Sequence, residues 1–372
     1  MTRLYLHIGL QKTGTSYLQN VCWGAVDRLR EQGVTLVPDG RIETFWLALA
    51  VRERVDPAHD GERVARSLEL LPDQLAAVRT PVALTSHETL AQASAEQIEG
   101  LLAACAGHEV HVVLTVRDLA RQIPSLWQEG LKAGRSDTLD EYVGALRAAT
   151  RRTDMDWKRL DLAAVLRRWA RFVPPERIHV VTVPGPGGPR EALLERYCSV
   201  LGIGADGLDP THAGPGNRAL GTAEAEVLRR VNDLLPQEYR RRVPYGEVGK
   251  RYFAMGILAR SDSGTAQLAR EHEEWCAEVA TESVRTIEEL GCAVAGDLAD
   301  LLPRPAAFGE SGAVDDAAAL EVATRALATM LEERLAQRLE QRTRPSQDSA
   351  GATAASGLRS RLASLSRRFR AG

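Results

Sequence analysis

Short apolar runs alternate with longer amphipathic segments through the first half of the chain. The apolar runs are rich in Val, Ile and Leu and are bounded by polar or glycine-containing turns: Leu4–Gly9, Val34–Val37, Pro81–Ser86, Glu109–Val116 and Arg177–Val183. Such continuous runs are typical of parallel strands that are buried on both faces. Between them, apolar residues at helical spacing predict helices over Ser16–Gln32, Ala95–Ala106, Ile123–Ala133 and Leu160–Phe172. The pattern predicts an α/β fold with a central, mainly parallel sheet flanked by helices.

From about residue 223 onward the chain reads mainly as helix, most clearly over Asp315–Arg342, which is rich in Ala, Leu, Glu and Arg. We expect an α/β domain over 1–302 whose helical flank begins near residue 223, followed by a helical extension over 303–343. The remaining residues, 344–372, first become rich in Pro, Ser, Ala and Gly and then basic. This composition predicts a flexible basic tail.

Composition narrows the class of protein. The 372 residues are 44% hydrophobic and 26% charged, close to the average for soluble globular proteins, and the net charge of −3 predicts no nucleic-acid partner. Five scattered cysteines without a CxxC pair favour a reducing compartment. We expect a cytoplasmic protein, because the sequence has no run of about 20 apolar residues and no signal peptide at its start. The arginines from Arg359 to Arg370 predict at most a weak contact with an anionic membrane surface.

The residues from Arg3 to Leu18 read as strand, glycine turn and helix. Such a turn directs backbone N–H groups and the positive end of a helix at an anion, and Lys12 adds a full charge. An ordinary nucleotide-hydrolysing loop would end in Gly-Lys-Ser/Thr, whereas here the order is Lys-Thr-Gly-Thr-Ser. A simple glycine turn joining strand to helix is the alternative. The candidate phosphate-binding residues are Lys12, Thr13, Gly14, Thr15 and Ser16.

A second candidate anchor follows the strand that ends at Val116. Arg117 comes directly after it, and Ser125 follows eight positions later. Arginine offers a forked, permanently charged donor and serine a neutral one, so the two can grip one phosphate. Pro124 predicts a helix that begins near it, because proline is tolerated in a first helical turn. The alternative is that Arg117 pairs with Asp118 or with a distant acid.

Together the two motifs resemble those of bacterial sulfotransferases that use 3′-phosphoadenosine 5′-phosphosulfate. Members of that family carry a Lys-[Thr/Ser]-Gly-Thr-[Thr/Ser] loop for the 5′-phosphosulfate and an Arg-x7-Ser arrangement for the 3′-phosphate. The resemblance covers about residues 1–220 and implies a P-loop-like nucleotide-binding fold. It implies that Lys12 contacts the 5′-phosphate and that Arg117 and Ser125 select the 3′-phosphate. The Arg-Lys-Gly nucleotide-binding loop of cytosolic animal members is absent from the sequence. Gly216–Leu220 is the candidate to take its place.

Candidate general bases follow the strand Pro81–Ser86, where His87 and Glu88 are adjacent. Ligands bind at the carboxyl ends of strands in such sheets, and either residue could accept a proton. Successive strand residues face opposite sides, so one of the two points into the site. We favour Glu88, with His87 as its positioning partner or as the base itself. In the alternative, Glu88 only caps the next helix and His87 packs among satisfied neighbours.

These observations predict an enzyme that moves a sulfuryl group from 3′-phosphoadenosine 5′-phosphosulfate to a hydroxyl of a carbohydrate, lipid or small-molecule acceptor. Lys12 would serve the leaving group, and no metal is required, because positioning and electrostatics supply most of the catalysis in the related phosphoryl transfers. A P-loop kinase or nucleotide hydrolase and a non-catalytic nucleotide-binding protein are the alternatives.

Overall fold

The computed structural model describes residues 2–148, 157–189, 191–213, 219–240, 242–261, 263–310 and 314–343. The chain divides into two units, one that ends at Ala319 and one that begins at Leu320. The α/β fold lies in the first unit, and the described part of the second belongs to the long helix α14 (Asp316–Thr343). The predicted tail and most of Gly216–Leu220 lie outside the described residues. Within the described ranges, no helix is both long enough and apolar enough to cross a bilayer.

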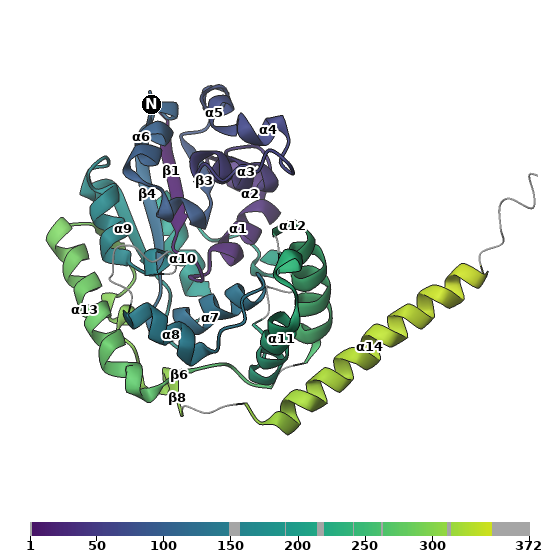
Figure 1. Ribbon diagram of the computed structural model, residues 1–372. Helices are drawn as coiled ribbons and strands as arrows, with labels where there is room; N and C mark the ends of the chain where they lie inside the picture. The colour runs from purple at the N-terminus through teal and green to yellow at the C-terminus, as the bar shows by residue number, and fades with distance from the viewer. Residues whose placement is uncertain are drawn as a thin grey trace, which may run out of the picture. The chain divides into compact units, whose positions relative to one another are not determined.

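Six parallel strands form the central sheet (Figure 1), in the order β2-β3-β1-β4-β5-β7. Their bounds are β1 Arg3–Gly9, β2 Val34–Leu36, β3 Val82–Ser86, β4 Glu109–Val116, β5 Ile178–Thr182 and β7 Ala293–Ala295. The five predicted strands are confirmed, as is the parallel sheet. β1 pairs with β3 on one side and with β4 on the other. The carboxyl ends of these three strands therefore share one edge of the sheet.

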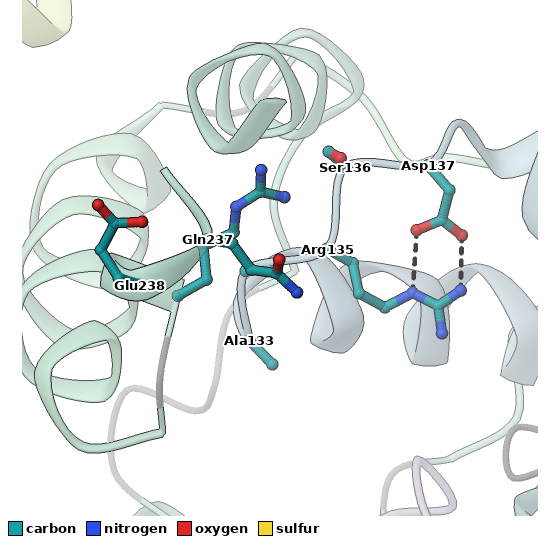
Figure 2. Close-up of a pocket in the computed structure, with 8 residues that line it drawn as sticks. Ala133, Arg135, Ser136, Asp137, Gln237 and Glu238 are labelled. Atoms are coloured by element: carbon teal, nitrogen blue, oxygen red, sulfur yellow. Dashed lines mark hydrogen bonds and ion pairs between the residues drawn. The ribbon is translucent and has the colours of Figure 1, made fainter. Parts of the chain in front are cut away.

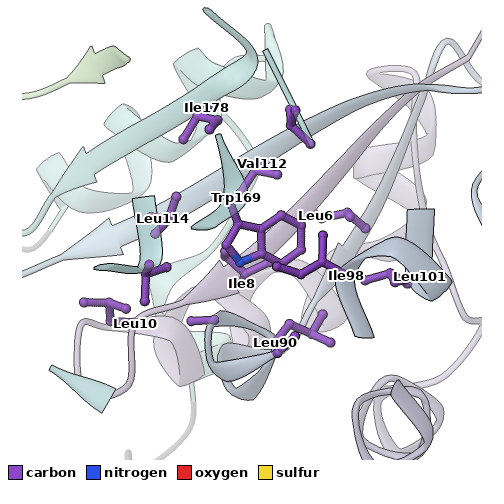
Figure 3. Close-up of a cluster of buried hydrophobic side chains, with 14 of the residues drawn as sticks. Leu6, Ile8, Leu10, Leu90, Ile98, Leu101, Val112, Leu114, Trp169 and Ile178 are labelled. Atoms are coloured by element: carbon purple, nitrogen blue, oxygen red, sulfur yellow. The ribbon is translucent and has the colours of Figure 1, made fainter. Parts of the chain in front are cut away.

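Helices cover both faces of the sheet, and the alternation of side chains along β1 explains why. Leu4, Leu6 and Ile8 enter one core with α3 (Arg41–Val51), α5 (Ser67–Ala76), α6 (Ala95–Ala104) and α9 (Leu162–Trp169). Tyr5 enters the other core with α1 (Thr15–Gly24), α2 (Val26–Glu31) and α10 (Glu191–Leu201). In the first core the ring of Trp169 lies among strand residues that include Leu6, Ile8 and Leu114 (Figure 3).

Further elements extend the first unit. They include α4 (Glu62–Ala65), the 3₁₀ helix η1 (Glu88–Gln92), α7 (Leu119–Leu131), α8 (Leu139–Ala148), η2 (Trp157–Arg159), α11 (Thr222–Leu234), α12 (Arg242–Tyr245), the π-helical segment η6 (Gly246–Ile257) and α13 (Glu273–Leu290). A two-stranded sheet joins β6 (Leu268–Ala269) to β8 (Phe308–Gly309). The second half is thus mainly helical, as predicted, but β7 follows α13 and pairs with β5. The sequence did not predict β7, because its three residues, Ala-Val-Ala, make no recognisable apolar run.

Two predicted helices differ from the observed ones. The segment Ser16–Gln32 forms α1 and α2, because Ala25 leaves the helical conformation with φ −129°. α7 begins four residues before the predicted Ile123, since the Asp118 side chain accepts a hydrogen bond from the Arg121 N–H at 3.0 Å and caps the helix. Pro124 therefore lies inside α7 and not in its first turn.

Replacing Trp169 tests the importance of the first core. Its side chain is completely buried against the sheet, so Trp169→Ala should lower the free energy of unfolding by about 3–5 kcal/mol. The matched control, Leu234→Ala, removes a side chain that is 84% exposed and should change stability by no more than about 0.5 kcal/mol. Urea unfolding followed by circular dichroism measures both. Equal effects of the two substitutions would contradict the assignment of this core.

Candidate functional site

The loop between β1 and α1 has the geometry of an anion-binding turn. Gly14 is the N-cap of α1 with φ 87°, and a Cβ atom there would lie 2.5 Å from the Leu193 side chain. No side chain caps α1 and no acid lies in its first turn. The positive end of the helix is therefore not neutralised by its own residues. Within the loop, the Thr13 hydroxyl donates to the Leu10 carbonyl at 2.6 Å, which holds the turn closed.

One face of α7 lies against this loop. The Gln122 amide donates to the Gln11 carbonyl at 2.7 Å, and the Lys12 ammonium donates to a Glu129 carboxylate oxygen at 2.5 Å. Ser125 lies between these two contacts on the same helical face, because residues three, four and seven apart share a face. Its hydroxyl donates to the Arg121 carbonyl at 2.9 Å. The structure thus brings Ser125 to the side of α7 that faces the loop.

Arg117 also reaches the loop, where its Nη1 donates to the Lys12 carbonyl at 3.4 Å. The alternative pairing of Arg117 with Asp118 is wrong, because the Asp118 carboxylate binds Arg121. Within the described part of the chain, no carboxylate lies within ion-pair distance of Arg117, and its buried Nε has no hydrogen-bond partner. Burial lowers the pKa of Arg117 to about 10; the nearby Arg121 acts in the same direction, and the Asp118 carboxylate opposes the shift. The half-buried guanidinium thus forms no ion pair with a described residue.

Sequence reasoning missed a cluster of charges around Glu129. Besides Lys12, the ammonium group of Lys250 on η6 donates to this carboxylate. Burial alone would raise the pKa of Glu129, but Lys12 and Lys250 hold it down at about 2. Burial, together with the other two lysines, lowers the pKa of Lys132 to about 8 although Glu129 opposes the shift. The sequence could have indicated Glu129, because Gln122, Ser125 and Glu129 are spaced along one helical face. No local sequence pattern indicates Lys250.

His87 and Glu88 follow β3 at the same edge of the sheet. His87 is the N-cap of η1, and its Nδ1 accepts from the Thr89 N–H at 3.3 Å. The capping role that the alternative gave to Glu88 therefore belongs to His87. Burial lowers the pKa of His87, and the Glu88 carboxylate opposes the shift.

Glu88 lies directly beside the loop between β1 and α1. Its carboxylate accepts from the Gln19 amide of α1 at 3.3 Å. A Cβ atom on Gly9 would lie 2.8 Å from the Glu88 carbonyl oxygen, so only glycine permits this close approach. The structure thus places the favoured base next to the loop that carries Lys12.

A buried chain of hydrogen bonds connects the three strand ends. His7 Nδ1 is 2.8 Å from the Ser86 hydroxyl and His7 Nε2 is 3.2 Å from the Thr115 hydroxyl. The Thr115 and Thr13 hydroxyls are 2.7 Å apart. Burial lowers the pKa of His7 to about 3, with His87 adding to the shift, so the imidazole is neutral. These hydrogen bonds tie the loop between β1 and α1 to β3 and β4.

Two other features of the structure provide no candidate catalytic residue. Within the described ranges, no group of three or more His, Cys, Asp or Glu side chains could hold a metal ion. A recess of about 890 Å³ lies beyond the C-terminal end of α7 (Figure 2), but none of the predicted site residues lines it. Its Arg135 is committed to Asp137, with nitrogen–oxygen distances of 2.9 and 2.8 Å.

The neutral His7 predicts a pH dependence of stability. Below pH 6.5 the unfolded chain binds a proton at this residue that the folded chain excludes until about pH 3. The wild-type protein should therefore lose about 1.4 kcal/mol of stability per pH unit in this window through His7 alone. The destabilisation caused by His7→Asn should shrink at the same rate as the pH falls, measured by urea unfolding between pH 7 and pH 4.5. A difference between wild type and His7→Asn that stays constant across this range would contradict the expectation.

No protein-family model matches this chain, and neither a curated protein nor a solved structure matches it. Lys12, Glu88, Arg117 and Ser125 lie around one edge of the sheet, and this arrangement is the basis for assigning a function.

Proposed function

We propose that the protein is a sulfotransferase of P-loop-like fold that uses 3′-phosphoadenosine 5′-phosphosulfate. One observation carries the proposal: Arg117, which forms no ion pair with any described carboxylate, touches the backbone of the Lys12 loop, and Ser125 follows it eight residues later in α7. Two anion anchors thus lie side by side, which suits a ligand that has phosphate at both the 3′ and the 5′ positions. The loop and the end of α1 would bind the 5′ group.

In the proposed reaction, the acceptor oxygen forms a bond to sulfur while the bond from sulfur to the 5′-phosphate oxygen breaks. Glu88 takes the proton of the acceptor hydroxyl, because its carboxylate lies beside the loop. Lys12 stabilises the negative charge that grows on the leaving phosphate. To reach it, Lys12 must leave Glu129, and Lys250 remains to neutralise that carboxylate.

A kinase or nucleotide hydrolase is the second class of function, and one observation counts against it. Such enzymes hold Mg²⁺ with an aspartate after a strand, and Asp118 is the weak candidate for that role. The Asp118 carboxylate is buried, pairs with Arg121 and caps α7. It is therefore committed to structure.

Selectivity for the 3′-phosphate tests the nucleotide assignment. We expect 3′-phosphoadenosine 5′-phosphate to bind more tightly than ADP to the wild-type protein in calorimetry. Because a hydrogen bond to a charged group contributes about 1.5–3 kcal/mol, Arg117→Ala should weaken binding of the bisphosphate about 10- to 100-fold and leave ADP unchanged. Arg117→Lys, which keeps the charge but loses the fork, should give an intermediate loss. Equal affinity of wild type for both nucleotides would remove the basis of the proposal.

The general base is tested by two adjacent substitutions. Glu88→Gln should lower the rate of sulfate transfer about 10²- to 10⁴-fold, because it removes the proton acceptor. The glutamine side chain keeps an oxygen that can accept the hydrogen bond from Gln19. His87→Asn should have a smaller effect, because asparagine also caps a helix. Transfer of labelled sulfate from the nucleotide to a panel of hydroxyl acceptors measures both. Both variants should keep the affinity for 3′-phosphoadenosine 5′-phosphate, and full turnover in both would exclude either residue as the base.

A further inference from the structure

A pocket of about 340 Å³ lies between the end of α3, the turn from η1 into α6, and η2. Three cations and four other polar side chains line it: Arg52, Arg54, Lys158, Glu53, Gln92, Ser94 and Gln97. Within the described residues, no apolar side chain contributes to this lining. Such a pocket suits a small charged group and not an apolar one.

The cations of this pocket have no counter-ions. Among the described residues, no carboxylate lies within ion-pair distance of Arg52, Arg54 or Lys158, and the one acid in the lining, Glu53, accepts a hydrogen bond from the Gln97 amide at 3.2 Å. Burial lowers the pKa of Arg52 to about 10, and neighbouring arginines, Arg54 first among them, add to the shift. With three cations and one carboxylate in its lining, the pocket keeps a net positive charge from the described residues.

The pocket is connected to the candidate base through η1. Arg52 Nη1 donates to the Thr89 carbonyl at 2.8 Å and to the Gln92 side chain at 3.3 Å. η1 begins with Glu88, next to the phosphate-binding loop, and ends with Gln92, which lines the pocket. At roughly 2 Å per residue, the helix separates the two ends by about 8 Å.

We propose that this pocket binds an acidic group of the acceptor, a carboxylate or sulfate, while the reacting hydroxyl lies at Glu88. The inference deepens the proposed function and rests on it for the role of Glu88. It assigns the acceptor to hydroxyl compounds that also carry an acidic group, of which a uronic acid is a simple example. Arg52 and Arg54 supply forked donors that match the two oxygens of a carboxylate.

The test compares two probes that differ only at C6, which is a carboxylate in methyl glucuronide and a hydroxymethyl group in methyl glucoside, by calorimetry on the full chain at low ionic strength. Wild type should bind the glucuronide about tenfold more tightly, as expected for one hydrogen bond to a charged group. The double variant Arg54→Ser, Lys158→Ser removes two exposed side chains and should abolish this preference. The control Arg79→Ser, Arg285→Ser removes the same charge from exposed positions elsewhere and should retain it.

Equal binding of the two probes to wild type, or a preference that survives in the pocket variant, would overturn the inference. Displacement of the glucuronide by 3′-phosphoadenosine 5′-phosphate would also overturn it, because the pocket would then belong to the nucleotide. A different result would contradict the proposed function and leave the pocket assignment intact. A chain that prefers the glucuronide through Arg54 and Lys158 but binds both nucleotides equally would support an acid-binding pocket and contradict the sulfotransferase assignment.

Discussion

The pairing of β1 with β3 on one side and β4 on the other determines where every candidate site residue lies. Because the three strands are parallel neighbours, the Lys12 loop, Glu88 and Arg117 all follow strand ends at one edge of the sheet. The chain of hydrogen bonds through His7 and Thr115 crosses these strands just beneath that edge. Buried polar groups need their partners, so a shift of any one strand would leave several of them unsatisfied. The register of the sheet and the position of the site are therefore fixed together.

Uncompensated positive charge is the second organising feature. Among the described residues, no carboxylate forms an ion pair with Arg117, and Lys12 shares the carboxylate of Glu129 with Lys250. Removing a charge from water without a partner costs free energy, so the protein alone bears this cost. An anion bound at the loop would offset it. Stability and ligand binding thus make opposing demands on the same residues, as is common in functional sites.

The proposed donor and acceptor sites lie at the two ends of η1. The loop beside Glu88 would hold the sulfuryl donor, and the basic pocket at Gln92 would hold the charged part of the acceptor. Fixing both reactants on one short helix restricts their relative motion, which is a large part of the catalysis of two-substrate reactions. His87 contributes by capping that helix, and Arg52 by binding its Thr89 carbonyl.

The sequence by itself determined five of the six strands of the central sheet, the glycine loop and the α/β class, because these depend on local hydrophobic patterns and on backbone geometry at Gly9 and Gly14. It also identified Lys12, Glu88 and Arg117 as candidates, since each follows a strand. It did not determine the partners of these residues. Only the tertiary structure showed that Asp118 binds Arg121, that Lys250 shares Glu129, and that no described carboxylate forms an ion pair with the cations around Arg52. Lys250 and Glu129 are 121 positions apart, a contact that local sequence patterns do not encode. Asp118 and Arg121 are only three positions apart, but the sequence offered Arg117 as an equally near partner for that carboxylate.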